Sequence, residues 1–153
     1  MSIQITNDQQ LREALNDLTP TQHRELGGLY VSSVSHLSPD PRIARALEAA
    51  AKPDIPAQEL EEAHKSVKAF ATQSYTACGR DADWAAQAEH FVAAAAAACL
   101  APEDQTGERS NNAWKAAMQA RMAKNCEMIF KDAGELANEA EKQYQIAEKF
   151  LNG

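Results

Sequence analysis

The sequence predicts an all-α fold, a helical bundle of five to seven helices in a single domain over residues 1–153. Alanine accounts for 31 of the 153 residues and forms an unbroken run from Ala93 to Ala98. Because alanine has the highest intrinsic helix propensity and is depleted in strands, the chain has little material for a sheet. All six prolines precede Gly107, each at a position where a helix could begin or end.

Helix-start signals define the first two elements. A short helix is predicted over residues 8–18. For the next helix, Thr19 can cap the end, Pro20 fits the first turn and Gln22 stands at the capping-box position. The core-facing side of this second helix is predicted to hold His23, Leu26, Tyr30, Val34 and Leu37.

A third helix is predicted to begin with Pro41, because Asp40 before it is a good N-cap residue. The loop 52–55 ends it. Gly27 and Gly28 lie inside the second helix and are not followed by a phosphate-binding pattern. Close packing of that helix against a neighbour explains the pair better than ligand binding.

The fourth and fifth helices are predicted to form the centre of the bundle. The fourth covers residues 56–78, and Gly79 supplies a left-handed C-cap. The fifth begins at Asp81 or its neighbour, and alanine on several of its sides indicates a central, Ala-rich helix covered by others. Trp84 and Phe91 are seven residues apart, so we expect them to be buried together on one face.

The last segment, residues 111–151, contains no proline and one glycine, Gly134. We predict one long C-terminal helix running through Gly134, in preference to a helix that folds back along its own bundle after a kink there. The apolar residues from Phe130 to Leu151 repeat about every 3.5 residues, as in a coiled coil. Since residues 131–153 would then extend past the bundle, the sequence predicts a homodimer through the C-terminal helix.

Charge and cysteine content predict the compartment and exclude some partners. The chain has 15 Lys and Arg against 22 Asp and Glu, a net charge of −7 that repels phosphate backbones and anionic lipids. We therefore expect no nucleic-acid and no membrane partner. Three cysteines without C-x-x-C spacing, and no signal-peptide pattern at the start, predict a cytoplasmic protein with reduced thiols at Cys78, Cys99 and Cys126.

One pattern raises the question of a metal. Glu61 and His64 form a Glu-x-x-His motif, which places two ligands on one helix face as in di-iron bundles. Such sites need a second motif, and in the nearest candidate, residues 87–90, Gln87 replaces the first ligand. We therefore expect no metal and no other cofactor. The alternative is a metal-dependent helical-bundle enzyme that uses Glu61, His64, Glu89 and His90.

The densest polar cluster lies between the fourth and fifth helices. Arg80, Asp81 and Asp83 place charges beside Trp84 at this junction. A C-cap followed by an acidic helix start also explains these residues. Because loops on a rigid scaffold carry function more often than helix faces do, Arg80, Asp81 and Asp83 are the predicted partner-binding residues.

Residues 36–47, with the sequence HLSPDPRIARAL, are followed by a proline-interrupted loop and Ala-rich helices. This arrangement resembles the small helical immunity proteins of bacterial polymorphic-toxin systems, over about residues 25–130. Asp40-Pro41-Arg42 is its most specific part. The resemblance implies a non-enzymatic module that binds and neutralises a toxin, and the acidic net charge suits a basic toxin. The alternatives are the metal-dependent enzyme and a structural oligomer.

Overall fold

The computed structural model describes residues 3–78, 83–102, 111–131 and 138–153, and these residues form helices and loops without a strand. The all-α prediction is confirmed. The elements are α1 (Asp8–Asn16), α2 (Pro20–Ser32), the short 3-10 helix η1 (Ser35–Leu37), α3 (Pro41–Ala51), α4 (Ala57–Cys78), α5 (Trp84–Leu100), α6 (Asn112–Phe130) and α7 (Glu139–Asn152).

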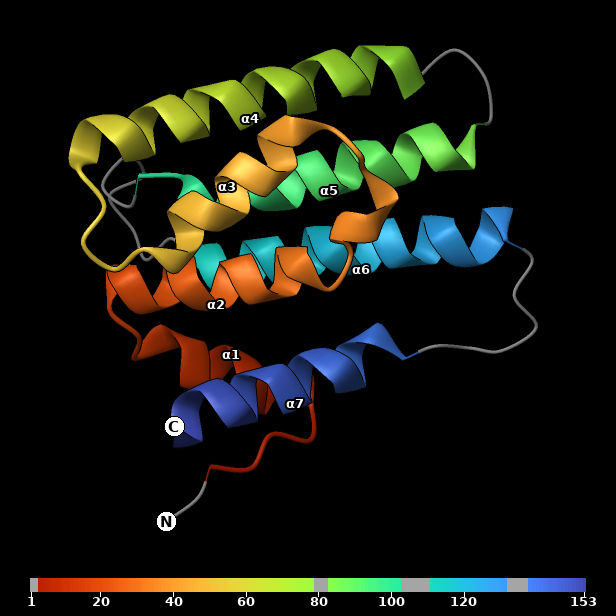
Figure 1. Ribbon diagram of the computed structural model, residues 1–153. Coiled ribbons are helices and arrows are strands. Elements are labelled where there is room, and N and C mark those ends of the chain that lie inside the picture. The colour runs from red at the N-terminus through yellow and green to blue at the C-terminus, as the bar shows by residue number, and fades with distance from the viewer. Residues whose placement is uncertain (1–2, 79–82, 103–110, 132–137) are drawn as a thin grey trace.

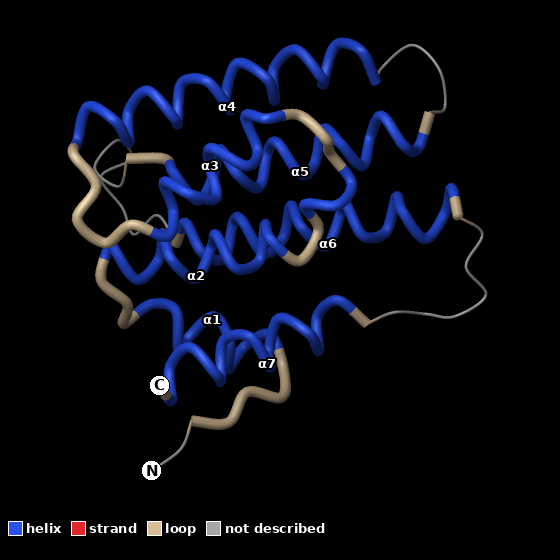
Figure 2. The backbone as a smooth tube through the Cα atoms, viewed as in Figure 1, coloured by secondary structure: helices blue, strands red, loops and turns tan. Residues whose placement is uncertain are grey.

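Three long helices, α4, α5 and α6, lie side by side and form one layer (Figure 1). Helices α2 and α3 pack together on one face of this layer, α2 along α6 and α3 against α4. Helices α1 and α7 lie beneath α2 and α6, and loops connect α1 through α4 (Figure 2). The architecture is thus a helical layer covered on one face.

The predicted starts of α2 and α3 are correct, whereas α5 begins at Trp84 behind the N-cap Asp83 and not at Asp81. Thr19 and Gln22 form the capping box, in which each side chain accepts a hydrogen bond from the other residue's backbone N–H. The Asp40 carboxylate accepts from the backbone N–H of Arg42 and caps α3. Local sequence therefore determines where α2 and α3 begin.

The two glycines of α2 allow three helices to approach it. A methyl group on Gly27 would lie 2.7 Å from Cβ of Cys99 in α5 and 3.5 Å from Cβ of Ala116 in α6. One on Gly28 would lie 2.7 Å from Cβ of Ala50 in α3. Close packing is therefore the physical reason for this pair, as the sequence predicts.

The core is built mainly from small side chains around α5. Val92 and Cys99 of α5 are buried, together with Ala93, Ala95 and Ala96 between them, and α5 packs against α2, α3, α4, α6 and η1, as expected of a central helix. On α6, the buried positions are again mostly alanine. Methyl-lined faces let the two helices approach toward the short end of the usual interaxial range.

Tyr30 is the largest fully buried side chain, and no described residue offers its hydroxyl a hydrogen bond. We expect Tyr30→Phe to raise the free energy of unfolding by about 1 kcal/mol, because it removes an unsatisfied buried polar group. Tyr144→Phe is the control: it deletes the 2.7 Å hydrogen bond to Asp8 and should not stabilise the protein. Urea titration measures both, and a Tyr30→Phe variant less stable than the wild type would contradict the expectation.

The predicted joint burial of Trp84 and Phe91 is wrong. Trp84 is 38% exposed and Phe91 is half-buried. Trp84 is the first residue of α5, and this end of the helix lies at the edge of the bundle, beyond the cover that α2 and α3 provide (Figure 1). Trp84 is therefore exposed because of its position at the end of the helix, although it lies on the same side of α5 as buried core residues.

The prediction of one long C-terminal helix is also wrong. α6 ends at Phe130, and a separate helix, α7, begins at Glu139 behind the N-cap Asn138. Gly134, the predicted kink position, lies outside the described residues. α7 packs on α1, α2 and α6, and its apolar residues join the protein's own core.

Polar contacts hold α7 in place. Gln143 is completely buried, donates to the carbonyl of Ala117 at 2.9 Å and accepts from Arg121 at 2.8 Å. Arg121 also makes two hydrogen bonds to Asp8 in α1. These contacts tie α1, α6 and α7 together.

The two ends of the described chain lie against each other. The backbone N–H of Ile3 donates to the Asn152 side chain at 2.8 Å, and the Asn152 amide donates back to the carbonyl of Ile3. The N–H of Ile5 donates to Glu148 at 2.7 Å.

In the described part of the chain, the helices lack the combination of length and apolar character needed to cross a membrane.

Candidate functional site

The surface most suited to binding is the face of the α4–α5–α6 layer opposite α2 and α3. Helix α5 packs against α4 and α6 at its sides and against α2, α3 and η1 on one face. Successive residues of an α-helix are about 100° apart, so the face opposite buried Val92 carries Ala94, Ala97, Ala98 and Ala101. These four alanines are only partly buried.

The neighbouring helices rise on both sides of these alanines. On α6, Met118, Met122 and Ile129 share the outward side, and Met122 and Ile129 are 45% and 51% exposed. On α4, His64, Lys68 and Tyr75 share one side, and the Tyr75 ring lies 5.5 Å from the His90 ring of α5. We name this surface the alanine face; its floor is Ala94, Ala97, Ala98 and Ala101, and its walls are these six residues of α4 and α6.

A cavity of about 460 Å³ opens beside one end of the alanine face. Much of its lining is apolar, with Leu60 of α4 and Leu100 of α5 among the contributors. The volume lies within the range of small-molecule sites, roughly 300–1,000 Å³. Its polar lining consists of Arg24, Glu61, His64, Lys65, Lys68, Cys99 and Asn112.

The charges around this cavity are mostly positive. Lys65 is paired with Glu61 at 3.1 Å, whereas Lys68 and Arg24 have no carboxylate partner among the described residues. Arg24 donates to the carbonyl of Lys52 at 2.8 Å, but its Nε–H is buried without an acceptor in the described structure. In a chain of net charge −7, this cavity therefore carries an excess of positive charge.

Two further groups in the cavity wall have shifted pKa values. Burial, and then the charge of Lys68, lower the pKa of His64, so its neutral form is favoured. Burial raises the pKa of Cys99 to about 12. Cys99 is therefore a protonated, unreactive thiol at neutral pH, and the cavity wall lacks an activated nucleophile at this position.

The residues of the alternative metal site do not come together. Glu61 and His64 line the cavity, but Glu89 accepts a hydrogen bond from Ser38, and His90 Nδ1 lies 3.0 Å from both Ser74 Oγ and the carbonyl of Ala71. Burial is the main cause that lowers the pKa of His90. Within the described residues no three His, Cys, Asp or Glu side chains are grouped closely enough to hold a metal ion.

Of the three predicted partner-binding residues, the structure describes one. Asp83 is exposed and caps α5, accepting from the backbone N–H of Ala86 at 3.1 Å. Arg80 and Asp81 lie outside the described residues. For Asp83, the helix-start explanation given by the sequence accounts for its contacts.

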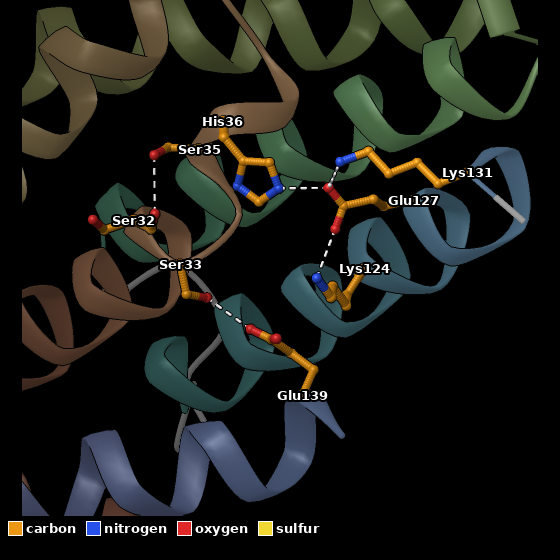
Figure 3. A network of polar contacts seen from close by, with 8 residues as sticks. All are labelled: Ser32, Ser33, Ser35, His36, Lys124, Glu127, Lys131 and Glu139. Carbon is orange, nitrogen blue, oxygen red and sulfur yellow. Dashed lines mark hydrogen bonds and ion pairs between the residues drawn. The ribbon is translucent and has the colours of Figure 1, made fainter. Parts of the chain in front are cut away.

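A second polar group, which the sequence does not reveal, surrounds Glu127 of α6 (Figure 3). The Glu127 carboxylate is buried and accepts from Lys124 at 2.7 Å and from Lys131 at 3.0 Å, and His36 Nε2 lies 2.6 Å from it. Beside it, Ser33 donates to Glu139 of α7 at 2.7 Å. We name His36, Lys124, Glu127 and Lys131 the Glu127 cluster.

The Glu127 cluster fits a structural role. Burial raises the pKa of Glu127, but hydrogen bonds from Lys124, Lys131 and His36 outweigh it and lower the pKa to about 2. The hydroxyls of Ser33 and Ser35 donate to backbone carbonyls or to Glu139. The cluster therefore joins η1 to α6, and the described contacts do not form a nucleophile–base pair.

Comparison of the chain with family models, with curated proteins and with solved structures found no match.

Proposed function

We propose that this protein is a non-enzymatic binding module that receives an amphipathic helix of a partner protein on the alanine face. The observation that carries the proposal is the partly exposed methyl floor on α5, which lies between the apolar side chains of α6 and the polar and aromatic side chains of α4. Small side chains let a further helix approach closely, and exposed apolar surface rimmed by polar residues is typical of protein interfaces.

Charge indicates which helix would fit. The rims of the alanine face carry Lys68 on α4 and Lys115 on α6, both exposed and without an ion-pair partner among the described residues. Lys65 stands near the same rim and is neutralised by Glu61. A partner helix with an apolar stripe flanked by acidic residues complements this pattern.

The resemblance to immunity proteins suggests the more specific role of neutralising a bacterial toxin. The partner would then be the toxin, bound in the cytoplasm, where the buried thiols of Cys99 and Cys126 stay reduced. The sequence predicts an acidic surface for a basic toxin, whereas the alanine face presents lysines. The toxin's docking helix would therefore be acidic.

Dimerisation through the C-terminal helix stays a prediction, but its stated reason no longer holds. The helix predicted to extend into solvent ends at Phe130, and α7 buries Ala147 and Gln143 inside the protein's own bundle. Sedimentation of the full chain and of a chain ending after Lys131 still measures the oligomeric state directly.

Photo-crosslinking tests the binding proposal. A benzophenone amino acid replaces Met122 on the alanine face or, as the control, Leu29 on α2; both native side chains are 45% exposed. In cells of the source organism we expect a discrete adduct from position 122 and none from position 29. The adduct's partner is then purified and titrated with the wild type, Ala94→Arg and Lys68→Glu.

The expected result is that Ala94→Arg weakens binding at least tenfold, because its side chain fills the floor of the alanine face, and that Lys68→Glu weakens it less. Circular dichroism checks that both variants fold. Equal adduct yields at positions 122 and 29, or a partner that binds Ala94→Arg as tightly as the wild type, would overturn the proposal.

A further inference from the structure

We infer that the cavity beside the alanine face binds a small organic carboxylate with an apolar chain. This inference stands apart from the proposed partner binding, since the cavity lies among α2, α4, α5 and the start of α6 and needs no partner helix to complete it. Three observations support it: the volume and lining, the unpaired cations, and the buried donor of Arg24.

The lining selects an apolar ligand body. Leu60 and Leu100, together with Pro20, Ala57, Ala101 and Pro102, supply most of the apolar surface, and the cavity volume of about 460 Å³ exceeds that of a medium-length acyl chain. Removing such a chain from water onto this apolar lining stabilises a complex. The wall thus favours a flexible aliphatic ligand over a fully polar one.

The cations select an anionic head group. Arg24 and Lys68 both line the cavity without a carboxylate partner among the described residues. Glu61, the acid in the cavity wall, is already paired with Lys65. An incoming carboxylate would therefore meet two uncompensated positive charges, whereas an ammonium head group would be repelled.

The buried donor makes the same point independently. The Nε–H of Arg24 is shielded from solvent and lacks an acceptor in the described structure, although the same guanidinium donates to the carbonyl of Lys52. An unsatisfied buried donor is costly, and native structures rarely keep one without a reason. Because the nitrogen is shielded from solvent in this structure, the guanidinium must turn for its Nε–H to donate to a carboxylate in the cavity.

Calorimetric titration with octanoate, octanol and octylammonium tests the inference, with chemical-shift mapping to locate the bound probe. We expect octanoate to bind at least tenfold more tightly than octanol, octylammonium not to bind, and the shifts to fall on Leu60 and Leu100. Lys68→Met should weaken octanoate binding about tenfold and leave octanol binding unchanged. Lys68 is exposed, so this variant should fold. Lys142→Met, at an exposed position of α7 outside the cavity, is the matched control and should leave octanoate binding unchanged.

Arg24→Met is a second variant, with a stronger expected loss of octanoate binding, because it removes both a charge and the buried donor. Its stability is measured in parallel, since Arg24 also holds the end of α3 through Lys52. No octanoate binding at millimolar concentration, equal affinities for octanoate and octanol, or an affinity that Lys68→Met leaves unchanged would each overturn the inference. The partner-binding proposal would survive all three results.

Discussion

Replacing Gly27 by valine is expected to lower the free energy of unfolding by about 3 kcal/mol. A Cβ at this position would lie 2.7 Å from Cβ of Cys99 in α5. A Cβ atom is fixed by the helix backbone, so it cannot rotate away as the end of a long side chain could. The added methyl groups would push α2 away from both α5 and α6. Urea titration followed by circular dichroism measures the loss.

Two comparisons separate packing from helix propensity. Leu29→Val places the same side chain at an exposed position of α2 and should change stability by less than about 0.5 kcal/mol. Gly27→Ala improves intrinsic helix propensity by about 1 kcal/mol, yet we expect it to destabilise the protein because of the contact with Cys99. In a double-mutant cycle, adding Cys99→Gly should reduce the cost of Gly27→Ala. A Gly27→Ala variant more stable than the wild type would contradict the close approach.

Replacing Glu127 by glutamine is expected to cost up to about 3.5 kcal/mol at neutral pH. The pKa of Glu127 falls from the usual 4.5 to about 2, and each pKa unit corresponds to about 1.4 kcal/mol. Because the folded pKa is depressed, this stabilisation is fully present above about pH 4.5 and is lost as the pH falls toward 2. Glutamine keeps the shape of the side chain but loses the charge that Lys124, Lys131 and His36 contact.

Unfolding of wild type and Glu127→Gln is measured by urea titration at pH 7, 4.5 and 2.5. The difference in stability should be large at pH 7 and at pH 4.5 and should be smaller at pH 2.5. Glu48→Gln, at an exposed position of α3, is the control and should have little effect at any pH. A difference of the same size at pH 2.5 as at pH 7 would show that hydrogen-bond geometry, not charge, explains the loss.

The sequence predicts the helices well because their causes are local. The alanine content determines the fold class, and the capping residues Thr19 and Asp40 are read directly from neighbouring positions. The glycine pair is interpretable for the same reason. The residues that start each helix lie within a few positions of one another in the sequence. The structure adds which neighbouring helix each one packs against.

The break before α7 was missed because no proline marks it. A local signal was present, however: Asn138 caps the helix, and Glu139 and Glu141 occupy its first turn. The apolar repeat from Phe130 to Leu151 also fits a continuous helix, so periodicity alone does not reveal where α7 begins. The apolar residues of α7 pack on α1, α2 and α6 of the same chain.

The candidate sites depend on contacts that sequence does not encode locally. Within the Glu127 cluster, the spacing of Lys124, Glu127 and Lys131 is visible along one helix, but His36 is 91 positions away. The cavity joins Arg24 to Lys68 across different helices. Glu61 and His64, which the sequence singles out by their metal-ligand spacing on α4, line this cavity.

The contacts between the chain ends dictate an order of events during synthesis. α1 packs on α6 and α7, and Ile3 and Ile5 bond to residues near the end of α7. These partners are synthesised after α2 to α5, so residues 3–16 stay unprotected while α2 to α5 are already available to pair. A chain halted after Leu100 should therefore lose residues 3–16 to a protease that leaves the folded protein intact, and synthesis through α7 should end that sensitivity.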